Sequence, residues 1–395
     1  MLYRLSYCGV DKNAGLAEYT YFAFKFKSAA LAGHRLPCLH QTPDIMRPLK
    51  IWLPSLNAGS GASVFVLRLA HALEKQGHEP VVQWFNRWFE PAPWLLGCTS
   101  PPAGTDIIHV NSWHGFAFRQ QGIPLVVTEH HFVDAPSFRP LTTPAQRAYH
   151  RLLISRFTRW SYAAADAVTT VSHFCAGEMR TALPAPAHVI PNWIDTDEFS
   201  PLPRTPRAGP FRLLFVGNPS PRKGADILPC LAEQLGPDFE IICMGGLRKG
   251  FREDSLPANM RLAPSVPVQE MPSIYRAADA ALVPTRFETF GYVAAEAMAC
   301  GLPIIGFNRA GTAEICRQDE TALLVPGDDI DALARQARRL AADPALAERL
   351  GKAGRKRILE HYSEGRSVTA YIDLYQQLLA ACKSGQQGPA RPDRS

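Results

Sequence analysis

Apolar and polar positions alternate along the chain in a repeating order that begins near Met46. The run 49–54 has the length and apolar content of a buried strand, and 56–61 is a glycine-containing turn. Residues 64–75 carry apolar side chains at helical spacing, stop before Gly77, and are followed by a strand-like run at 80–85. This order predicts a βαβ unit with parallel strands.

The same order continues through two halves of the chain. In the first half, further strands are predicted at 106–110, 124–128 and 167–171. In the second half, strands are predicted at 211–216, 239–244, 280–283, 303–306 and 322–325, with helices between them and a helix-rich end. We therefore expect an α/β protein with two Rossmann-like domains, at 46–195 and 211–380, whose parallel sheets face each other across a cleft.

Three segments fall outside the two predicted domains. Residues 196–210 are rich in proline, which is typical of a linker. Residues 1–45 lack the repeating order, and three interpretations stay open: an appendage, an upstream stretch before a true start at Met46, or an extra ordered helix. Residues 381–395 are predicted to be a disordered tail.

Composition narrows the class of protein. Hydrophobic residues make up 46% and charged residues 20%, which is ordinary for a globular protein, and no apolar run is long enough to span a membrane. The net charge of +6 is dispersed, so no nucleic-acid partner is expected. The nine cysteines form no C-x-x-C pair, and no signal peptide is evident; we expect a cytoplasmic protein with reduced thiols.

The most informative chemistry lies in 284–303. A strand is predicted to end near Pro284, a loop then carries Glu288 and Thr289, and Gly291 precedes a helix that contains Glu296. The free backbone N–H groups and positive dipole of a helix start suit a diphosphate. The two carboxylates, eight positions apart, are placed to bind hydroxyl groups on either side of that anion.

Cations follow another strand of the second half. The strand 211–216 leads into a turn with Asn218 and then Arg222 and Lys223, which can balance a diphosphate and stabilise a departing nucleotide. In the first half, Gly59, Ser60 and Gly61 follow the first strand, where small residues let backbone amides approach a phosphate or sugar.

These residues carry a resemblance to a known family. The stretch from Glu288 to Glu296 and its continuation AMACGLP resemble the E-x7-E motif of the GT4 family of retaining glycosyltransferases. The resemblance extends from Met46 to about Leu379. Within this range, further motifs of the family occur in order at 77–79, 190–195, 216–217, 223–224, 311–315 and 323–325. The resemblance implies the GT-B fold, a nucleoside-diphosphate sugar as donor, and retention of configuration.

The resemblance also implies roles for single residues. Glu296 is expected to hold the donor ribose and Glu288 the donor-sugar hydroxyls, while Arg222 and Lys223 neutralise the diphosphate. His130, in the sequence Thr-Glu-His, is expected beside the transferring sugar. Backbone amides of the segment after Glu288 are expected to bind the distal phosphate; this segment comprises Thr289, Phe290, Gly291, Tyr292 and Val293.

Two departures from the family pattern affect the donor site. Asn218 stands where many members have arginine, so Arg222 beside Lys223 is expected to take that role. Ser60 stands where a first glycine of a Gly-Gly pair is common. No D-x-D cluster follows a strand, so no metal and no further cofactor are expected. We expect front-face attack by the acceptor hydroxyl, with leaving-group stabilisation by the two cations.

A separate segment, 138–162, combines five arginines and five aromatic residues with no acidic residue. Two interpretations stay open: attachment to an anionic membrane surface that presents a lipid-linked acceptor, or an ordinary amphipathic helix with a solvated basic face. The first would place the protein peripherally on the inner face of the plasma membrane.

The predicted function is transfer of a sugar to a glycan or lipid-linked acceptor in lipopolysaccharide or other surface-polysaccharide biosynthesis. Two alternatives remain: a sugar-nucleotide epimerase, and a non-catalytic nucleotide-sugar-binding subunit of a transferase complex. The E-x7-E context argues against the epimerase, and the presence of Glu288, Glu296 and Lys223 argues against the binding subunit.

Overall fold

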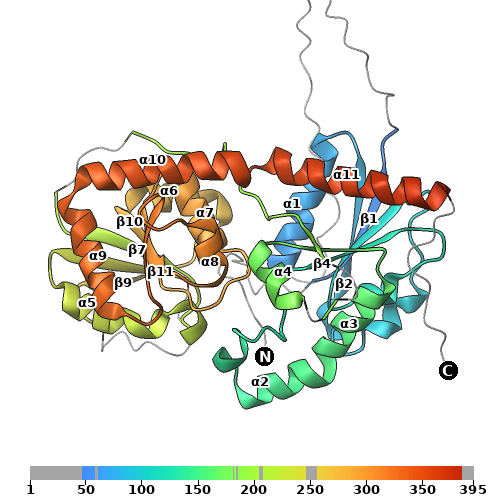
Figure 1. Cartoon of the computed structure of the whole chain (residues 1–395), viewed down its shortest axis with the longest axis horizontal. Coiled ribbons are helices and arrows are strands. Elements are labelled where there is room, and N and C mark those ends of the chain that lie inside the picture. The colour runs from blue at the N-terminus through green and yellow to red at the C-terminus, as the bar shows by residue number, and fades with distance from the viewer. Residues whose placement is uncertain are drawn as a thin grey trace, which may run out of the picture.

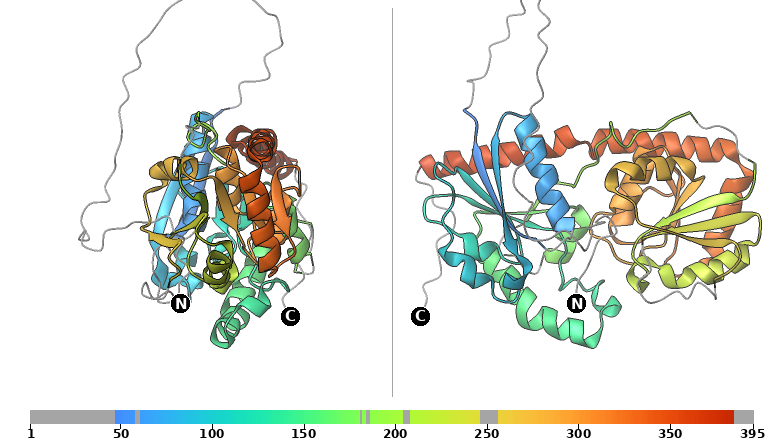
Figure 2. Two further views of the ribbon diagram at one scale, coloured as in Figure 1. Left: turned by 90° about the vertical axis from the view of Figure 1, so that its left-hand side faces the viewer. Right: turned by 180° about the vertical axis from the view of Figure 1, so that it is seen from behind.

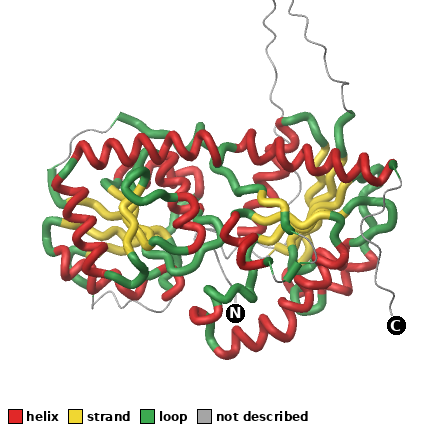
Figure 3. Tube along the Cα trace, in the orientation of Figure 1, coloured by secondary structure: helices red, strands yellow, loops and turns green. Residues whose placement is uncertain are grey.

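The computed structural model describes residues 47–57, 61–180, 182–183, 186–203, 208–245 and 256–384. Two six-stranded sheets form the centres of two α/β domains that lie side by side (Figures 1 and 3). Every strand pairing is parallel, with the orders β2-β1-β3-β4-β5-β6 and β12-β11-β10-β7-β8-β9. The predicted fold class, two Rossmann-like domains with parallel sheets, is confirmed.

The middle of the first sheet is formed by its two fully buried strands. β3 and β4 are buried along their whole length, as expected for strands covered by helices on both faces. Its strands are β1 (Lys50–Asn57), β2 (Glu79–Asn86), β3 (Ile107–Asn111), β4 (Leu125–Glu129), β5 (Ala167–Thr170) and β6 (His188–Val189). Its helices are α1 (Gly61–Lys75), α2 (Pro144–Tyr149), α3 (Ser155–Ala164) and α4 (His173–Met179).

The second sheet is built in the same way. Its strands are β7 (Phe211–Val216), β8 (Phe239–Met244), β9 (Met260–Ala263), β10 (Ala280–Val283), β11 (Ile304–Phe307) and β12 (Ala322–Val325). Its helices are α5 (Leu228–Leu235), α6 (Met271–Ala277), α7 (Tyr292–Ala299), α8 (Ala310–Ile315), α9 (Ile330–Ala342) and α10 (Pro344–His361).

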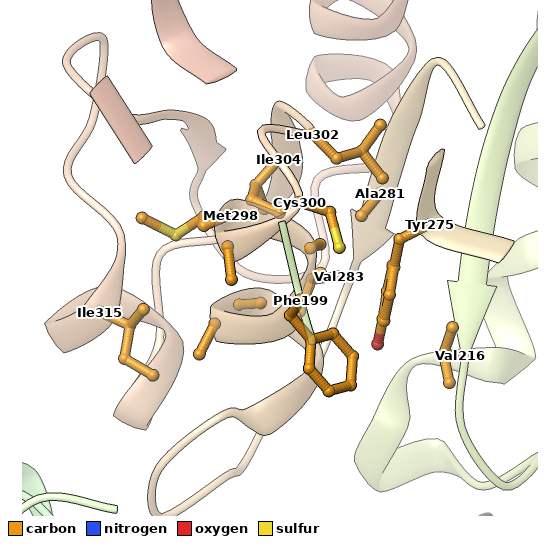
Figure 4. Packing of buried hydrophobic residues seen from close by; sticks show 14 of the residues in the cluster. Phe199, Val216, Tyr275, Ala281, Val283, Met298, Cys300, Leu302, Ile304 and Ile315 are labelled. Atoms are coloured by element: carbon orange, nitrogen blue, oxygen red, sulfur yellow. The ribbon is translucent and has the colours of Figure 1, made fainter. Parts of the chain in front are cut away.

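One core cluster fixes the helix that carries the E-x7-E motif. α7 presents small residues to the sheet, and Met298 and Cys300 fill the space toward β10 and β11 together with Phe199 and Tyr275 (Figure 4). All of these side chains are at least 95% buried. Close packing of this kind holds α7, and therefore Glu296, at a fixed height over the sheet.

The last helix, α11 (Glu364–Lys383), packs into the core of the first domain. Val368, Tyr371, Leu374 and Tyr375 join the core cluster of β1, α1 and β3 in the first domain. α10 and α11 run end to end along one side of the molecule and span both sheets (Figures 1 and 2). The sequence-based prediction that the whole of 211–380 belongs to the second domain is therefore wrong for α11. Helical periodicity does not show which of two sheets a helix covers.

The structure differs from the sequence prediction at several boundaries. β6 and β9 were missed, since one has two residues and the other carries an exposed arginine. Residues 381–383 belong to α11 and are not a disordered tail, because the helix continues to Lys383. Residues 1–46, the Gly59-Ser60 pair and residues 385–395 lie outside the described residues, so the predictions made for them stay predictions.

The linker is held against the second domain. Phe199 is fully buried, and the Arg355 guanidinium donates hydrogen bonds to the carbonyls of Thr196 at 2.9 Å and Phe199 at 2.6 Å. Arg276 donates to the carbonyl of Ser200 at 2.7 Å. The linker up to Ser200 therefore moves with the second domain.

Candidate active site

Gly224 lets two loops of the donor side come together. Gly224 has φ of +74°, and a Cβ there would lie 2.0 Å from the carbonyl oxygen of Pro284, so only glycine fits between the two loops. The N–H of Arg286 then donates to the carbonyl of Arg222 at 2.9 Å. The turn after β7 and the loop after β10 are thereby joined, because β7 and β10 are neighbours in the sheet.

This junction places both predicted cations on one carboxylate. Arg222 Nη1 lies 3.2 Å from Glu288 Oε2 and donates to the Phe287 carbonyl at 3.0 Å. Lys223 Nζ donates to the same Glu288 oxygen. All three side chains are largely buried. The arrangement is an anion held by two cations at the carboxyl end of the sheet.

The charges of this cluster determine its protonation. Burial by itself would raise the pKa of Glu288, but the positive charges of Lys223 and Arg222 outweigh it and hold that pKa at about 2. Burial lowers the pKa of Lys223, and the Glu288 carboxylate opposes that shift. Glu288 is therefore ionised at neutral pH, and its charge neutralises one of the two cations.

Glu296 lies about one turn into α7 and is 2% exposed. Its Oε2 accepts a hydrogen bond from the Tyr275 hydroxyl at 3.0 Å, and its Oε1 lies 3.6 Å from Nη2 of Arg68. Arg68 belongs to α1 of the first domain, and its guanidinium also lies 4.9 Å from the ring centre of Tyr292. The second motif carboxylate is thus placed where the two domains meet.

His130 follows β4 and faces the donor domain. Its ring packs against Phe65 at 4.5 Å between ring centres, and its carbonyl accepts a hydrogen bond from Thr289 Oγ1 at 2.7 Å. Among the described residues, its buried Nε2 has no hydrogen-bond partner. Burial lowers the pKa of His130 to about 3, so the imidazole is neutral at neutral pH.

Thr289 is held by the first domain on both sides. Besides its bond to His130, its carbonyl accepts a hydrogen bond from Ser172 Oγ at 2.5 Å. The carboxylate of Glu314 accepts from the backbone N–H groups of His173 at 2.9 Å and Phe174 at 2.7 Å, which adds a further bridge between the domains. The loop that carries the first motif glutamate is therefore closed against the first domain.

The remaining predicted donor residues surround the start of α7 and the ends of β7 and β1. Gly291 has φ of +99° and precedes α7, whose first residues are Tyr292 and Val293, and Phe290 is buried beneath them. Asn218 follows β7 and is half-buried. Gly61 is the first residue of α1, two turns before Arg68.

Sequence reasoning missed several residues of this region. Arg68 is a single cation within an otherwise apolar stretch of α1, and that contrast was the available signal. Glu129 is 1% exposed and accepts hydrogen bonds from the Tyr162 hydroxyl at 2.7 Å and the His131 N–H at 2.8 Å. Burial raises the pKa of Glu129, and these bonds oppose that shift. Glu129 orients the turn that presents His130.

In the part of the chain that the structure describes, no group of three or more His, Cys, Asp or Glu side chains could hold a metal ion. Independence from metal stays a prediction. None of the described helices is both long and apolar enough to cross a membrane.

Comparisons with known proteins match both halves of the chain. Residues 92–198 match the family described as Glycosyltransferase Family 4, and residues 202–357 match Glycosyl transferases group 1. Similar proteins include the D-inositol 3-phosphate glycosyltransferase of Salinispora arenicola, 28% identical over 70% of this chain and 69% of that protein. The alpha-maltose-1-phosphate synthase of Mycolicibacterium smegmatis is 27% identical over 69% of this chain and 79% of that protein.

Solved structures give the same picture. The sucrose-phosphate synthase of Thermosynechococcus elongatus superposes with a TM-score of 0.71 and 26% identity, over 84% of this chain and 100% of that one. HepE of Anabaena, solved in complex with UDP, has a TM-score of 0.64 and 18% identity over 85% of this chain and 100% of that one. The GT-B fold expected from the sequence is confirmed.

Proposed function

Because the chain belongs to the family 4 glycosyltransferases, we propose that it transfers a sugar, with retention, from a nucleoside-diphosphate sugar to a glycan or lipid-linked acceptor. The expectation of a glycosyltransferase is confirmed by these matches, which favour it over the epimerase and the binding subunit. We propose lipopolysaccharide or a related surface polysaccharide as the product.

One observation carries the donor assignment: two cations and a carboxylate converge beside the start of α7. Arg222 and Lys223 both contact Glu288, and Glu296 is buried eight residues further on. A diphosphate supplies the negative charge that Glu288 now supplies to the cations. HepE, which shares the fold, has been solved with UDP and with UDP-glucose, which supports a nucleotide-sugar donor here.

In the proposed reaction, the donor diphosphate lies between Arg222, Lys223 and the free N–H groups at the start of α7. Glu288 then exchanges its cations for hydroxyl groups of the donor sugar, and Glu296 accepts from the ribose. As the glycosidic bond to the phosphate breaks, the two cations stabilise the negative charge that grows on the leaving diphosphate.

The first domain provides a neutral environment for the attack. His130 is uncharged at neutral pH, so it donates or accepts a hydrogen bond at the sugar and adds no charge. The acceptor hydroxyl attacks on the face from which the diphosphate leaves, and its proton passes to a diphosphate oxygen. No separate general base is then required.

Thermal unfolding tests the donor site directly. The purified chain is heated with UDP, GDP, ADP or CMP, each with and without Mg²⁺. A nucleotide at about 100 times its dissociation constant adds about 2.7 kcal/mol to the free energy of unfolding. We expect one nucleoside diphosphate to raise the melting temperature without Mg²⁺, and the corresponding nucleotide sugars are then assayed for turnover.

Glu296→Ala should weaken that shift, because the ribose loses its acceptor. Glu348→Ala is the matched control, since Glu348 is exposed on α10, where it forms an ion pair with Lys352. If no nucleotide stabilises the folded wild-type chain, the proposed donor site is wrong. If Glu348→Ala weakens the shift as much as Glu296→Ala does, the role of Glu296 is wrong.

A further inference from the structure

Large apolar side chains gather on one face of the first domain. Five of them are more than half exposed: Trp88 75%, Trp94 53%, Leu95 61%, Leu152 57% and Trp160 51%. They come from two separate segments, the short helices η1 (Arg87–Phe89) and η2 (Pro93–Cys98), and the long helix formed by α2, η5 (His150–Ile154) and α3. Exposed tryptophan in such numbers is costly in water and marks a contact surface.

Direct contacts join these two segments into one face. The ring of Trp94 lies 5.9 Å from that of Phe157, and Phe157 lies 5.8 Å from Trp160. The Tyr149 hydroxyl donates to Glu90, between η1 and η2, at 2.8 Å. We call these residues, with the arginines described next, the Trp/Arg face.

The long helix has a π turn that aligns its exposed side chains. η5 is a π-helix set between α2 and α3. A π turn holds roughly one residue more than the 3.6 of an α turn, so one turn of each spans about eight residues. Arg151 and Arg159 are eight residues apart, as are Leu152 and Trp160, and all four are exposed. The helix therefore presents a row of arginines beside an apolar row.

The charge of the face is positive. Arg87, Arg147, Arg151, Arg156 and Arg159 are all exposed, and residues 138–162 include no acidic residue. The nearby acidic groups are few: Asp134 lies 3.9 Å from Arg159, and Glu90 is bound to Tyr149. A surface that is both positive and rich in exposed tryptophan suits a bilayer with anionic headgroups, where indole rings lie at the level of the headgroups.

One end of the face lies near the donor loop. α3 lies below the first sheet, and α2 forms the end of the long helix that is nearer the second domain (Figure 1). The loop before α2 carries Phe138, whose ring lies 4.9 Å from that of Phe287, and Phe287 directly precedes Glu288. A bilayer bound to the Trp/Arg face would hold a lipid-linked acceptor close to the donor loop.

We propose that the Trp/Arg face binds the surface of an anionic lipid bilayer, with Trp88, Trp94 and Trp160 in the headgroup layer and the arginines against lipid phosphates. The lipid-linked acceptor rests on the proposed function, but the binding surface does not. Each arginine near an anionic surface contributes roughly fivefold to partitioning.

Vesicle sedimentation tests this surface with the full chain. Vesicles contain phosphatidylcholine alone or with about 30% phosphatidylglycerol, at low salt and at about 0.5 M salt. We expect binding to the anionic vesicles only, and weaker binding in high salt. Arg151→Glu with Arg156→Glu should reduce binding at least about 25-fold, and Trp88→Ser with Trp94→Ser should reduce it in both salt conditions.

The control is Arg335→Glu with Arg366→Glu, the same change of charge at exposed positions outside the face. It should reduce binding less than the Arg151/Arg156 pair does. Each variant is also heated with the stabilising nucleotide, and retention of that shift shows an intact donor site. Absence of vesicle binding by the wild type, or equal loss in the control pair, would overturn the proposal. So would tryptophan-dependent dimers without vesicle binding, which would assign the face to a second copy of the chain.

Discussion

Around Glu288, the two domains contribute different kinds of side chain. The second domain presents charges that neutralise one another, Arg222 and Lys223 against Glu288. The first domain presents buried imidazoles, and burial lowers the pKa of His130 and His131 to about 3. A charged half can bind an anionic leaving group, whereas a neutral half can bind hydroxyl groups without competing for that anion. We therefore expect the second domain to bind the diphosphate, while His130 of the first domain adds an uncharged hydrogen-bonding group beside the sugar.

The largest expected effect is the loss of a cation from the charged half. Lys223→Ala should lower the transfer rate about 100- to 1,000-fold, because the departing diphosphate loses a buried positive charge. Steady-state rates with the identified nucleotide sugar measure this effect. Arg261→Ala is the control, since Arg261 is exposed and pairs with Glu240. Lys223→Arg should recover part of the rate, and an unchanged rate in Lys223→Ala would remove the cation from the mechanism.

Substitution of His130 in the first domain should leave nucleotide binding intact. His130→Asn should lower the transfer rate about 10- to 100-fold through a lost hydrogen bond at the sugar, while the shift in melting temperature with the nucleoside diphosphate stays the same. Rate and shift are measured on one preparation, with His71→Asn on the exposed side of α1 as control. A lost nucleotide shift in His130→Asn would contradict the division between the domains.

The buried histidines of the first domain should also destabilise the folded protein at acidic pH. Burial lowers the pKa of His109 to about 3, while the unfolded chain has the ordinary value of 6.5. Between these values the unfolded state binds one more proton, so stability is complete above pH 6.5 and falls as the pH falls toward 3. Near pH 5 this histidine changes the free energy of unfolding by about 1.4 kcal/mol per pH unit.

Urea unfolding between pH 5 and 7 measures that dependence. His109→Gln should reduce the slope by about one proton, whatever its effect on the stability at pH 7. His114→Gln should act in the same direction, because burial lowers the pKa of His114 to about 4. An unchanged slope in both variants would mean that these imidazoles are charged in the folded protein.

The smallest expected effect is an increase in nucleotide affinity on loss of the Glu288 charge. Glu288→Gln removes the carboxylate that holds Arg222 and Lys223, so a nucleoside diphosphate should bind about three- to tenfold more tightly while sugar transfer falls. Titration calorimetry with the nucleoside diphosphate measures the affinity. Glu296→Gln should weaken binding instead. Weaker binding in both variants would mean that Glu288 supports the nucleotide and does not compete with it.

The strands and loops of the donor side were predicted from the sequence, but the contact of Arg222 and Lys223 with Glu288 was not. Arg222 follows β7 and Glu288 follows β10, and the two strands are neighbours in the sheet. Hydrophobic periodicity does not predict the order of strands in a sheet. Both cations were therefore expected to bind a diphosphate, and neither was expected to contact Glu288. The helix start after Gly291 was predictable, because one contiguous segment contains it.

The first domain was less predictable because its site is assembled from distant parts. Arg68 lies close to Glu296 only because α1 and α7 face each other in the folded protein, and the sequence of α1 does not predict this contact. His109 hydrogen-bonds to the Tyr375 hydroxyl at 2.6 Å and to Thr128 Oγ1 at 2.6 Å. The first of these bonds spans more than half of the chain. Local patterns carry no information on such contacts.

The position of α11 has a consequence for the order in which the protein can form during synthesis. Chains leave the ribosome from the N-terminus, and domains commonly fold as they emerge. Here the first sheet lacks Tyr371 and Tyr375 until the strands of the second domain have all been synthesised. Until then its buried His109 lacks one hydrogen-bond partner, and the apolar side of α1 that α11 covers stays in water. The second domain, whose core cluster contains no residue of α11, can be complete while the first domain still waits for its closing helix.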